Sequence, residues 1–218
     1  WGSNGTVGRS GSCRTYYPYG IKVHDGIIYV GSYYDRKIRK IRVSDGACLG
    51  SINTANAYPR SIDIHNGHLY ASTSSGLFTQ NLSNGASKIC SGTYRNEWRY
   101  SYTITGSGSY LYNHYGYTMY RNTLTSSGSN LCPTSVKSYT DSSISYGYGM
   151  TAHPTNPNEL YFMSRGRNAI YKITVNSNGT GRTINWQKGR YGYNKTSTAT
   201  QNYFYYPWGI HYDDDNDR

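Results

Sequence analysis

An all-β fold of repeated four-stranded antiparallel sheets is predicted by three features of this sequence. A short aromatic segment recurs about every 40 residues, apolar stretches follow each copy, and Gly-containing turns separate those stretches. The copies of this aromatic segment are residues 17–21, 58–62, 98–102, 146–150 and 206–210. A repeat of this length built from short strands is typical of one blade of a β-propeller, which is the fold we predict.

Each repeat contains signals for four strands. Asp25-Gly26 joins two apolar stretches in the first repeat, and Asn66-Gly67 does so in the second. Both dipeptides tolerate the positive φ that a two-residue hairpin turn requires. A third stretch, another turn and a fourth stretch follow in each repeat, so each repeat predicts one antiparallel blade.

The predicted organisation is a single β-propeller domain, residues 1–218. Its four full blades are residues 16–50, 56–92, 97–136 and 146–186, and residues 187–204 form an extended loop. Residues 6–15 match a fourth strand and 205–218 match a first strand and turn, so we predict a split or truncated fifth blade formed by 205–218 with 1–15. Either the chain is part of a longer polypeptide with a larger propeller, or it is complete with one trimmed blade.

The repeat resembles the NHL-repeat and gluconolactonase-like propellers, which are of the six-bladed type. Their blades run Pro-x-Gly-Ile, a Gly turn, aliphatic-Tyr-Val and Arg-x-Ile-x-Lys-Ile, and the first repeat matches at 20–21, Gly26, 28–30 and 36–41. The resemblance covers most of the chain at the level of the fold, although the third repeat keeps little of the pattern. A shared fold does not carry a function with it.

Catalysis has little support in this sequence. The gluconolactonase-like enzymes hold a metal with Glu, Asn and Asp side chains, but no acidic residue begins a predicted first strand here. His24, His65 and His153 occupy the same place in three repeats, as expected of a duplicated unit rather than of one metal site. No nucleophile elbow, phosphate loop or carboxylate pair is evident. We predict no enzymatic activity and no required cofactor.

One acidic cluster lies near the end of this basic chain. It contains Asp213, Asp215 and Asp217, whose carboxylates are a weak candidate for calcium binding. The same residues fall where a hairpin turn is expected, and Asp is a good turn former.

Glycosylation sequons and cysteines both predict a secreted, extracellular protein. The four sequons begin at Asn4, Asn81, Asn178 and Asn194. The four cysteines, which are placed in predicted fourth strands, are Cys13, Cys48, Cys90 and Cys132. Disulfides are expected, with three pairings open. Equivalent rim positions of neighbouring blades lie far apart, so either the strands bend to meet or some thiols bond outside the chain.

Tyrosine dominates the aromatic residues, with 27 Tyr against 3 Phe, and the net charge is +11. Loops have no packing need for so many rings, whereas Tyr is a good contact residue for partners, including sugars. The candidate ligand-binding residues lie in the aromatic segments: Tyr17, Tyr19, Tyr58, Trp98, Tyr146, Tyr148, Tyr206 and Trp208. Basic residues within 36–42 add an electropositive strip suited to a polyanion such as a sulfated glycan.

The sequence therefore predicts a secreted, non-enzymatic recognition or scaffold propeller, with lectin-like glycan binding as its sharpest form. The alternative is a structural or adhesive extracellular-matrix protein, because Tyr, Gly and basic residues together suit self-assembling materials. A lactonase-like hydrolase is the weakest alternative. Expected partners are glycans, other extracellular proteins, polyanionic surfaces or further copies of the chain. Nucleic acid is not expected, and no apolar run is long enough to span a membrane.

Overall fold

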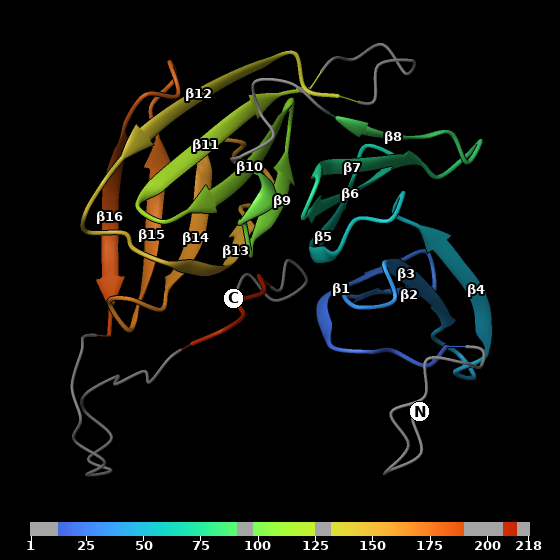
Figure 1. The fold of residues 1–218 in the computed structure, drawn as a ribbon. Helices are drawn as coiled ribbons and strands as arrows, with labels where there is room; N and C mark the ends of the chain where they lie inside the picture. Colours follow the sequence, from blue (N-terminus) through green and yellow to red (C-terminus); the bar gives the residue numbers. More distant parts are fainter. Residues whose placement is uncertain (1–12, 91–97, 125–131, 190–206, 213–218) are drawn as a thin grey trace, which may run out of the picture. The chain divides into compact units, whose positions relative to one another are not determined.

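The computed structural model describes residues 13–90, 98–124, 132–189 and 207–212. The strands in these residues form four four-stranded antiparallel sheets, and each strand pairs with its neighbour in the chain (Figure 1). The chain divides into two compact units, Trp1–Ser101 and Tyr102–Arg218. The predicted all-β fold of four-stranded antiparallel blades is confirmed.

The first unit contains two blades. The strands of blade 1 are β1 (Pro18–His24), β2 (Ile27–Ser32), β3 (Lys37–Arg42) and β4 (Cys48–Asn53). The strands of blade 2 are β5 (Pro59–His65), β6 (His68–Thr73), β7 (Gly76–Asn81) and β8 (Ser87–Cys90).

The second unit contains the other two blades. The strands of blade 3 are β9 (Ile104–Ser107), β10 (Tyr110–Tyr115), β11 (Thr118–Thr123) and β12 (Ser135–Thr140). The strands of blade 4 are β13 (Gly147–Ala152), β14 (Glu159–Ser164), β15 (Ala169–Val175) and β16 (Arg182–Lys188).

The predicted two-residue turns close the first hairpin of both blades in the first unit. Asp25 and Gly26 have φ of 47° and 69°, and Asn66 and Gly67 have φ of 48° and 72°. Two consecutive residues in the left-handed region match the right-handed twist of the strands that they connect. This local chemistry fixes the register in which β1 pairs with β2 and β5 pairs with β6.

Each unit is held together by an apolar core between its two blades. The core of the first unit contains Tyr29, Ile38 and Ile52 of blade 1, and Ile62, Ile64, Leu69, Ala71 and Phe78 of blade 2. The core of the second unit joins Tyr112 and Met119 of blade 3 to Met150, Leu160, Phe162 and Ile173 of blade 4. Burial of such apolar surface is the main term that holds neighbouring blades in contact.

Glycine allows the first strands of successive repeats to approach closely. A Cβ on Gly20 of β1 would lie 2.8 Å from the backbone nitrogen of Ile62 in β5. In the second unit, a Cβ on Gly149 of β13 would lie 2.9 Å from the backbone nitrogen of Ile210. Residues 207–212 therefore lie beside β13 as β5 lies beside β1, which brings the last aromatic segment to blade 4.

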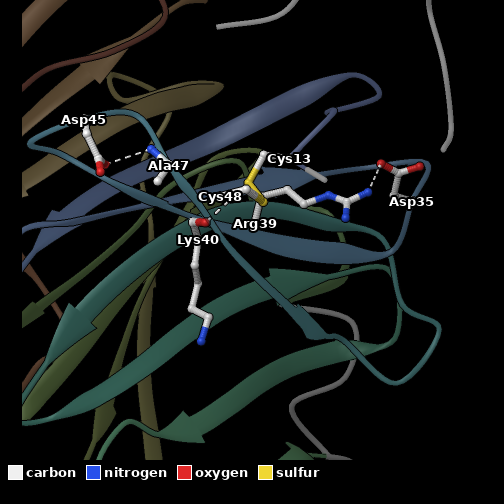
Figure 2. The surroundings of a disulfide bond; sticks show 7 residues. All are labelled: Cys13, Asp35, Arg39, Lys40, Asp45, Ala47 and Cys48. Atoms are coloured by element: carbon white, nitrogen blue, oxygen red, sulfur yellow. Dashed lines mark hydrogen bonds and ion pairs between the residues drawn. A yellow bond between two sulfur atoms is a disulfide. The ribbon is translucent and has the colours of Figure 1, made fainter. Parts of the chain in front are cut away.

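The placement of the cysteines corrects one prediction and resolves another. Cys48 and Cys90 lie in the fourth strands β4 and β8, but Cys132 precedes β12, whose pairing with β11 begins at Ser135. Cys13 lies before β1 and forms a disulfide with Cys48, with their Cα atoms 5.4 Å apart (Figure 2). All four cysteines lie in the described residues. Cys90 and Cys132 are also disulfide-bonded, so none of the four is a free thiol.

Several predicted features lie outside the described residues. They are most of the N-terminal strand expected within 1–15, the loop 187–204 beyond residue 189, and the turn that follows 212. Within the described ranges, no helix has the length and apolar character that a membrane crossing requires.

Candidate functional site

The candidate site of the second unit is built where β14 ends and β13 begins. The backbone N–H of Arg165, just after β14, donates to the Tyr146 carbonyl oxygen at 3.0 Å. The Ser145 N–H donates to the Ser164 hydroxyl at 3.3 Å, which fixes the same two chain segments together. Tyr146 and Asn168 have φ of 50° and 51°, so the chain turns sharply on both sides of this contact.

Three aromatic rings and one guanidinium gather on this frame. Tyr148 stacks on Tyr102, with ring centroids 4.9 Å apart, and meets Trp208 edge-on at 4.7 Å. The Arg165 guanidinium lies 5.0 Å from the Tyr148 ring and 4.8 Å from the Trp208 ring. Its Nη1 also donates to the Tyr148 hydroxyl at 3.2 Å. We call these four residues, together with Tyr146 of the backbone frame, the second-unit cluster: Tyr102, Tyr146, Tyr148, Arg165 and Trp208.

The second-unit cluster is open to solvent. Trp208 is 54% exposed and Tyr146 is 52% exposed, which is unusual for large rings. Tyr146, Tyr148, Arg165 and Gly166 line a shallow hollow of about 270 Å³. Pockets for drug-sized ligands are roughly 300–1,000 Å³, so this hollow suits one small ring rather than an extended molecule.

A buried histidine supports the cluster from blade 3. His114 of β10 packs against the Phe162 ring at 4.7 Å, and its Nδ1 accepts a hydrogen bond from the Gly147 N–H at 3.2 Å. Burial lowers the pKa of His114 to about 4, so the ring is neutral at physiological pH. Because Nδ1 accepts, the neutral ring carries its proton on Nε2.

The first unit repeats the same backbone frame. The Tyr33 N–H donates to the Tyr17 carbonyl oxygen at 3.1 Å, and the Tyr16 N–H donates to the Ser32 hydroxyl at 2.8 Å. Tyr17 and Arg36 have φ of 54° and 56°, as Tyr146 and Asn168 do in the second unit. The segment before the first strand and the turn after the second strand are therefore joined in the same way in blades 1 and 4.

Aromatic rings and arginines also gather here. Tyr33 stacks on Tyr58 at 4.9 Å, and Arg36 Nη2 donates to the Tyr58 hydroxyl at 2.8 Å. Arg60 lies 5.5 Å from the Tyr33 ring and donates to its hydroxyl at 3.2 Å. Tyr17 is 59% exposed and Tyr19 is 44% exposed. We define the first-unit cluster as Tyr17, Tyr19, Tyr33, Arg36, Tyr58 and Arg60.

Most described members of the predicted ligand-binding set lie in these two clusters. Tyr17, Tyr19 and Tyr58 belong to the first-unit cluster, and Tyr146, Tyr148 and Trp208 belong to the second-unit cluster. Trp98 is completely buried and offers no surface to a ligand, so we do not retain it. Tyr206 lies outside the described residues.

Sequence reasoning missed the arginines as members of these clusters. Arg165 follows Ser164 at the end of β14, as Tyr33 follows Ser32 at the end of β2, and this alignment was the available signal. The sequence places Arg36 in a predicted basic strip, but ion pairs neutralise part of that strip. Arg39 is buried against Asp35 at 3.0 Å, and Arg42 pairs with Asp45 at 2.8 Å.

Some of the predicted metal and modification sites lie within the described residues, and others lie outside them. Asp213, Asp215 and Asp217 lie outside the described residues, as do Asn4 and Asn194. Within the described ranges, no group of three His, Cys, Asp or Glu side chains could hold a metal ion. Asn81 is half-buried at the end of β7, whereas Asn178 is exposed in the turn between β15 and β16.

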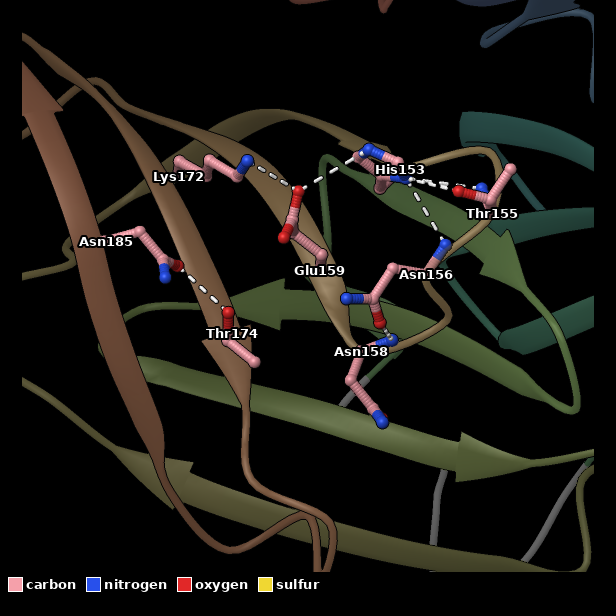
Figure 3. A network of polar contacts seen from close by, with 8 residues as sticks. All are labelled: His153, Thr155, Asn156, Asn158, Glu159, Lys172, Thr174 and Asn185. Carbon is pink, nitrogen blue, oxygen red and sulfur yellow. Dashed lines mark hydrogen bonds and ion pairs between the residues drawn. The ribbon is translucent and has the colours of Figure 1, made fainter.

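A polar network lies where β13 ends and β14 begins in blade 4 (Figure 3). Lys172 Nζ lies 2.7 Å from Glu159 Oε1, and His153 Nε2 lies 3.7 Å from the same oxygen. His153 Nδ1 accepts from the backbone N–H groups of Thr155 and Asn156, both at 3.2 Å. A hydrogen bond from Lys172 to Glu159 raises the pKa of Lys172. These contacts hold the turn after β13, which is a structural role.

Comparison with known proteins establishes the fold. No protein-family model matches the chain, and neither does any curated protein sequence. A candidate 6-phosphogluconolactonase from Bacteroides uniformis matches with a TM-score of 0.58 at 15% identity, over 77% of this chain and 53% of that chain. A chain of a nidogen/laminin complex matches with a TM-score of 0.55 at 13% identity, over 74% and 61%. The chain has a β-propeller fold.

A third match extends the range of proteins with this fold. A chain of a mitotic checkpoint complex matches with a TM-score of 0.55 at 10% identity, over 79% of this chain and 50% of that chain. This chain thus spans about half to three-fifths of the matched structures. At such identities the likeness shows the β-propeller fold alone, and it does not single out the gluconolactonase-like or NHL propellers.

Proposed function

We propose that the chain is a secreted, non-enzymatic recognition propeller that binds glycans through its aromatic–arginine clusters. The observation that carries this proposal is the second-unit cluster, where Tyr146 and Trp208 are more than half exposed beside a small hollow. If the Tyr146 and Trp208 rings served only to pack the fold, they would be buried. A partner that covers them gains apolar contact area at low cost in side-chain entropy.

Sugars fit this surface chemically. A pyranose has an apolar face of C–H groups that stacks on an aromatic ring, and hydroxyls around its edge that need directional partners. Trp208 and Tyr146 supply ring faces, while Arg165 and the Tyr148 hydroxyl supply polar groups beside them. A few fixed polar groups among apolar ones are the usual composition of a small-molecule site.

Secretion is part of the proposal and rests on separate observations. Disulfides persist in oxidising compartments, and all four cysteines are disulfide-bonded. The sequon at Asn178 lies in an exposed turn that leaves room for a glycan. One of the matched structures is a nidogen/laminin complex, so propellers of this fold take part in protein assemblies.

The structural or adhesive alternative is the second candidate. The content of Tyr, Gly and basic residues supports a self-assembling material. However, the cysteines that would cross-link such a material are already disulfide-bonded, Cys13 and Cys48 within this chain. It predicts assembly without sugar binding, which a sedimentation measurement of the purified chain detects.

A glycan array followed by titration calorimetry on the strongest hit tests the proposal. We expect Trp208→Ala to weaken binding about tenfold, which is about 1.4 kcal/mol. Trp186→Ala is the matched control, because Trp186 is an exposed tryptophan of the same unit that lies on β16 outside the cluster. The proposal fails if the array shows no sugar-competed binding, or if both variants change affinity equally.

A further inference from the structure

Two exposed tyrosines of the second unit have their rings in contact. Tyr117 lies in the turn between β10 and β11 and is 45% exposed, and Tyr146 precedes β13 and is 52% exposed. Their ring centroids lie 5.6 Å apart, with the ring planes at 60°. Both rings remain largely in solvent, so this contact adds little to the apolar core.

The backbone holds the two tyrosines in place. The Tyr146 N–H donates to the Gly116 carbonyl oxygen at 2.8 Å, and the Asp141 N–H donates to the Tyr117 carbonyl oxygen at 2.8 Å. Gly116 and Tyr146 have φ of 63° and 50°, so the chain turns sharply at both ends of the contact. The turn after β10 is therefore fastened to the start of β13, and each ring stands on a fixed backbone.

The hydroxyl ends of the two rings meet. The charge of an ionised Tyr117 and a hydrogen bond with the Tyr117 side chain raise the pKa of Tyr146. Because the hydroxyl is the only polar group of a tyrosine side chain, this bond joins the two hydroxyls. Each ortho carbon is one bond from the carbon that carries the hydroxyl, so an ortho edge of Tyr117 lies close to an ortho edge of Tyr146.

We propose that Tyr117 and Tyr146 form an oxidative modification site, at which the two rings are joined by a carbon–carbon bond as an intrachain dityrosine. The reaction partner is a haem peroxidase that uses hydrogen peroxide. The inference does not rest on the proposed glycan binding, and its test requires no sugar.

The reaction balances with hydrogen peroxide as the oxidant. Each phenol gives up one electron and one proton and becomes a phenoxyl radical, and hydrogen peroxide takes up both electrons and both protons to become two water molecules. The two radicals combine through a bond between their ortho carbons. The hydrogen on each of these carbons then moves to the neighbouring oxygen, which restores both aromatic rings. The chain loses two hydrogen atoms in all.

The bond would give blade 4 a covalent connection that its sequence otherwise lacks. Residues 133–218 contain no cysteine, whereas the Cys13–Cys48 disulfide connects to β4 of blade 1. A bond from Tyr117 to Tyr146 closes a loop somewhat shorter than the one that this disulfide closes, and it ties blade 3 to the start of β13. Such a closure stabilises a fold mainly by restricting its unfolded chain.

The first unit provides a comparison pair. Tyr17 and Tyr34 are 59% and 47% exposed, and their ring centroids lie 5.2 Å apart. Their planes are at 87°, so the edge of one ring points at the other ring instead of lying beside its edge. This pair matches Tyr117 and Tyr146 in exposure and separation but differs in orientation, so we expect it to couple less readily.

Oxidation of the folded chain tests the inference. A dilute solution is treated with a haem peroxidase and hydrogen peroxide, and the monomeric fraction is isolated by size exclusion. We expect dityrosine fluorescence, an intact mass lower by two hydrogen atoms, and a cross-linked peptide that joins residues 117 and 146. This peptide should be roughly tenfold more abundant than one that joins 17 and 34, because its reacting groups are already in position. In urea the preference should disappear.

Phenylalanine variants assign the coupling to this pair. Tyr117→Phe and Tyr146→Phe keep the ring but cannot form a phenoxyl radical, and we expect each to remove most of the dityrosine fluorescence of the monomer. Tyr34→Phe is the matched control and should leave that fluorescence nearly unchanged. Oxidation should raise the Tm of the wild-type chain by several degrees and leave that of Tyr117→Phe unchanged. Melts before oxidation verify that each variant is folded.

Three outcomes would overturn the inference. The first is a monomer without dityrosine when multimers linked through other tyrosines do form. The second is equal abundance of the 117–146 and 17–34 peptides in the folded chain. The third is monomer fluorescence that persists in both Tyr117→Phe and Tyr146→Phe. Each leaves the proposed function untouched, because the glycan array and calorimetry use the untreated chain.

Discussion

Gly147 donates its backbone N–H to Nδ1 of His114 at 3.2 Å, and this bond fastens the start of β13 to β10. The His114 ring is fully enclosed and packs against Phe162. Gly147 lies between Tyr146 and Tyr148, so the bond holds the backbone on which both rings of the second-unit cluster stand. A side chain at Gly147 would collide with the Phe162 ring and with His114, which is why glycine is required there.

The first prediction concerns pH. The pKa of His114 is about 4 in the folded chain and 6.5 in the unfolded chain. Above pH 6.5 the ring is neutral in both states and its burial carries no proton-linked cost. As the pH falls from 6.5 to 4, the unfolded chain binds a proton that the folded chain does not, so stability decreases. Below pH 4 the decrease levels off.

Urea unfolding at pH 7.5 and pH 4.5 measures this effect. The His114 contribution to the loss of unfolding free energy at pH 4.5 is on the order of 2–3 kcal/mol, since one pKa unit corresponds to about 1.4 kcal/mol. His114→Asn keeps an acceptor for the Gly147 N–H but does not titrate, and it should lose correspondingly less stability on acidification. Parallel pH dependence in the wild-type chain and the variant would contradict the assignment.

The second prediction concerns the disulfide between Cys13 and Cys48. It closes a loop with a sequence separation of 35 and ties the segment before β1 to the outer strand β4. The Cys13→Ser/Cys48→Ser variant should lose about 3–4 kcal/mol of unfolding free energy, because its unfolded chain regains loop entropy. Hydrogen exchange should localise the loss to blade 1, with blade 4 as the internal control. Protection that falls equally in both blades would show that the bond acts elsewhere.

Local signals in the sequence predicted the blades. The features that the sequence did not predict depend on contacts between residues far apart in the chain. The turn at Asp25-Gly26 needs nothing beyond its own two residues, so its hairpin could be read directly. The contact of Arg165 with Trp208 joins a turn after β14 to a segment beyond β16, and no local pattern records it. Trp98 occupies the same place in the repeat as exposed rings but is buried, because its neighbours decide its exposure.

The third prediction concerns modification. Asn178 is exposed, and its side-chain oxygen accepts one bond, from the Thr180 N–H at 3.0 Å. Asn81 is half-buried, and its oxygen accepts from the Ser83 N–H and hydroxyl at 2.9 and 2.7 Å. When the chain is expressed in a secretory system, it should carry a glycan at Asn178. Mass spectrometry should then detect a mass increment that a glycosidase removes and that the Asn178→Gln variant lacks.

The two sequons also differ in their expected effect on stability. Asn81→Gln should lower the unfolding free energy by about 1 kcal/mol even without a glycan, because the turn after β7 loses its side-chain hydrogen bonds. Asn178→Gln should leave the stability of the unglycosylated chain nearly unchanged. An unmodified Asn178 in secreted material, or equal destabilisation by both variants, goes against this assignment.

The last prediction links the fold to the site through Gly149. A Cβ at this position would lie 2.9 Å from the Ile210 nitrogen and 3.1 Å from the Gly209 backbone, and backbone atoms cannot rotate away as a side chain can. Gly149→Ala should therefore displace residues 207–212 from β13 and cost about 1–3 kcal/mol. Because Trp208 belongs to the displaced segment, sugar binding at the second-unit cluster should weaken as well.

Gly209→Ala is the matched control for this change. Gly209 faces Gly149 across the same contact, yet a Cβ there would meet no atom within 4 Å, so we expect little effect on stability or binding. Thermal melts and calorimetry compare the two variants. Gly20→Ala is added as the equivalent change at the contact of β1 with β5. Gly20→Ala should destabilise the first unit and leave sugar binding at the second-unit cluster unchanged. If Gly149→Ala binds sugar at the second-unit cluster as well as Gly209→Ala does, the close approach of residues 207–212 to β13 is not what positions Trp208.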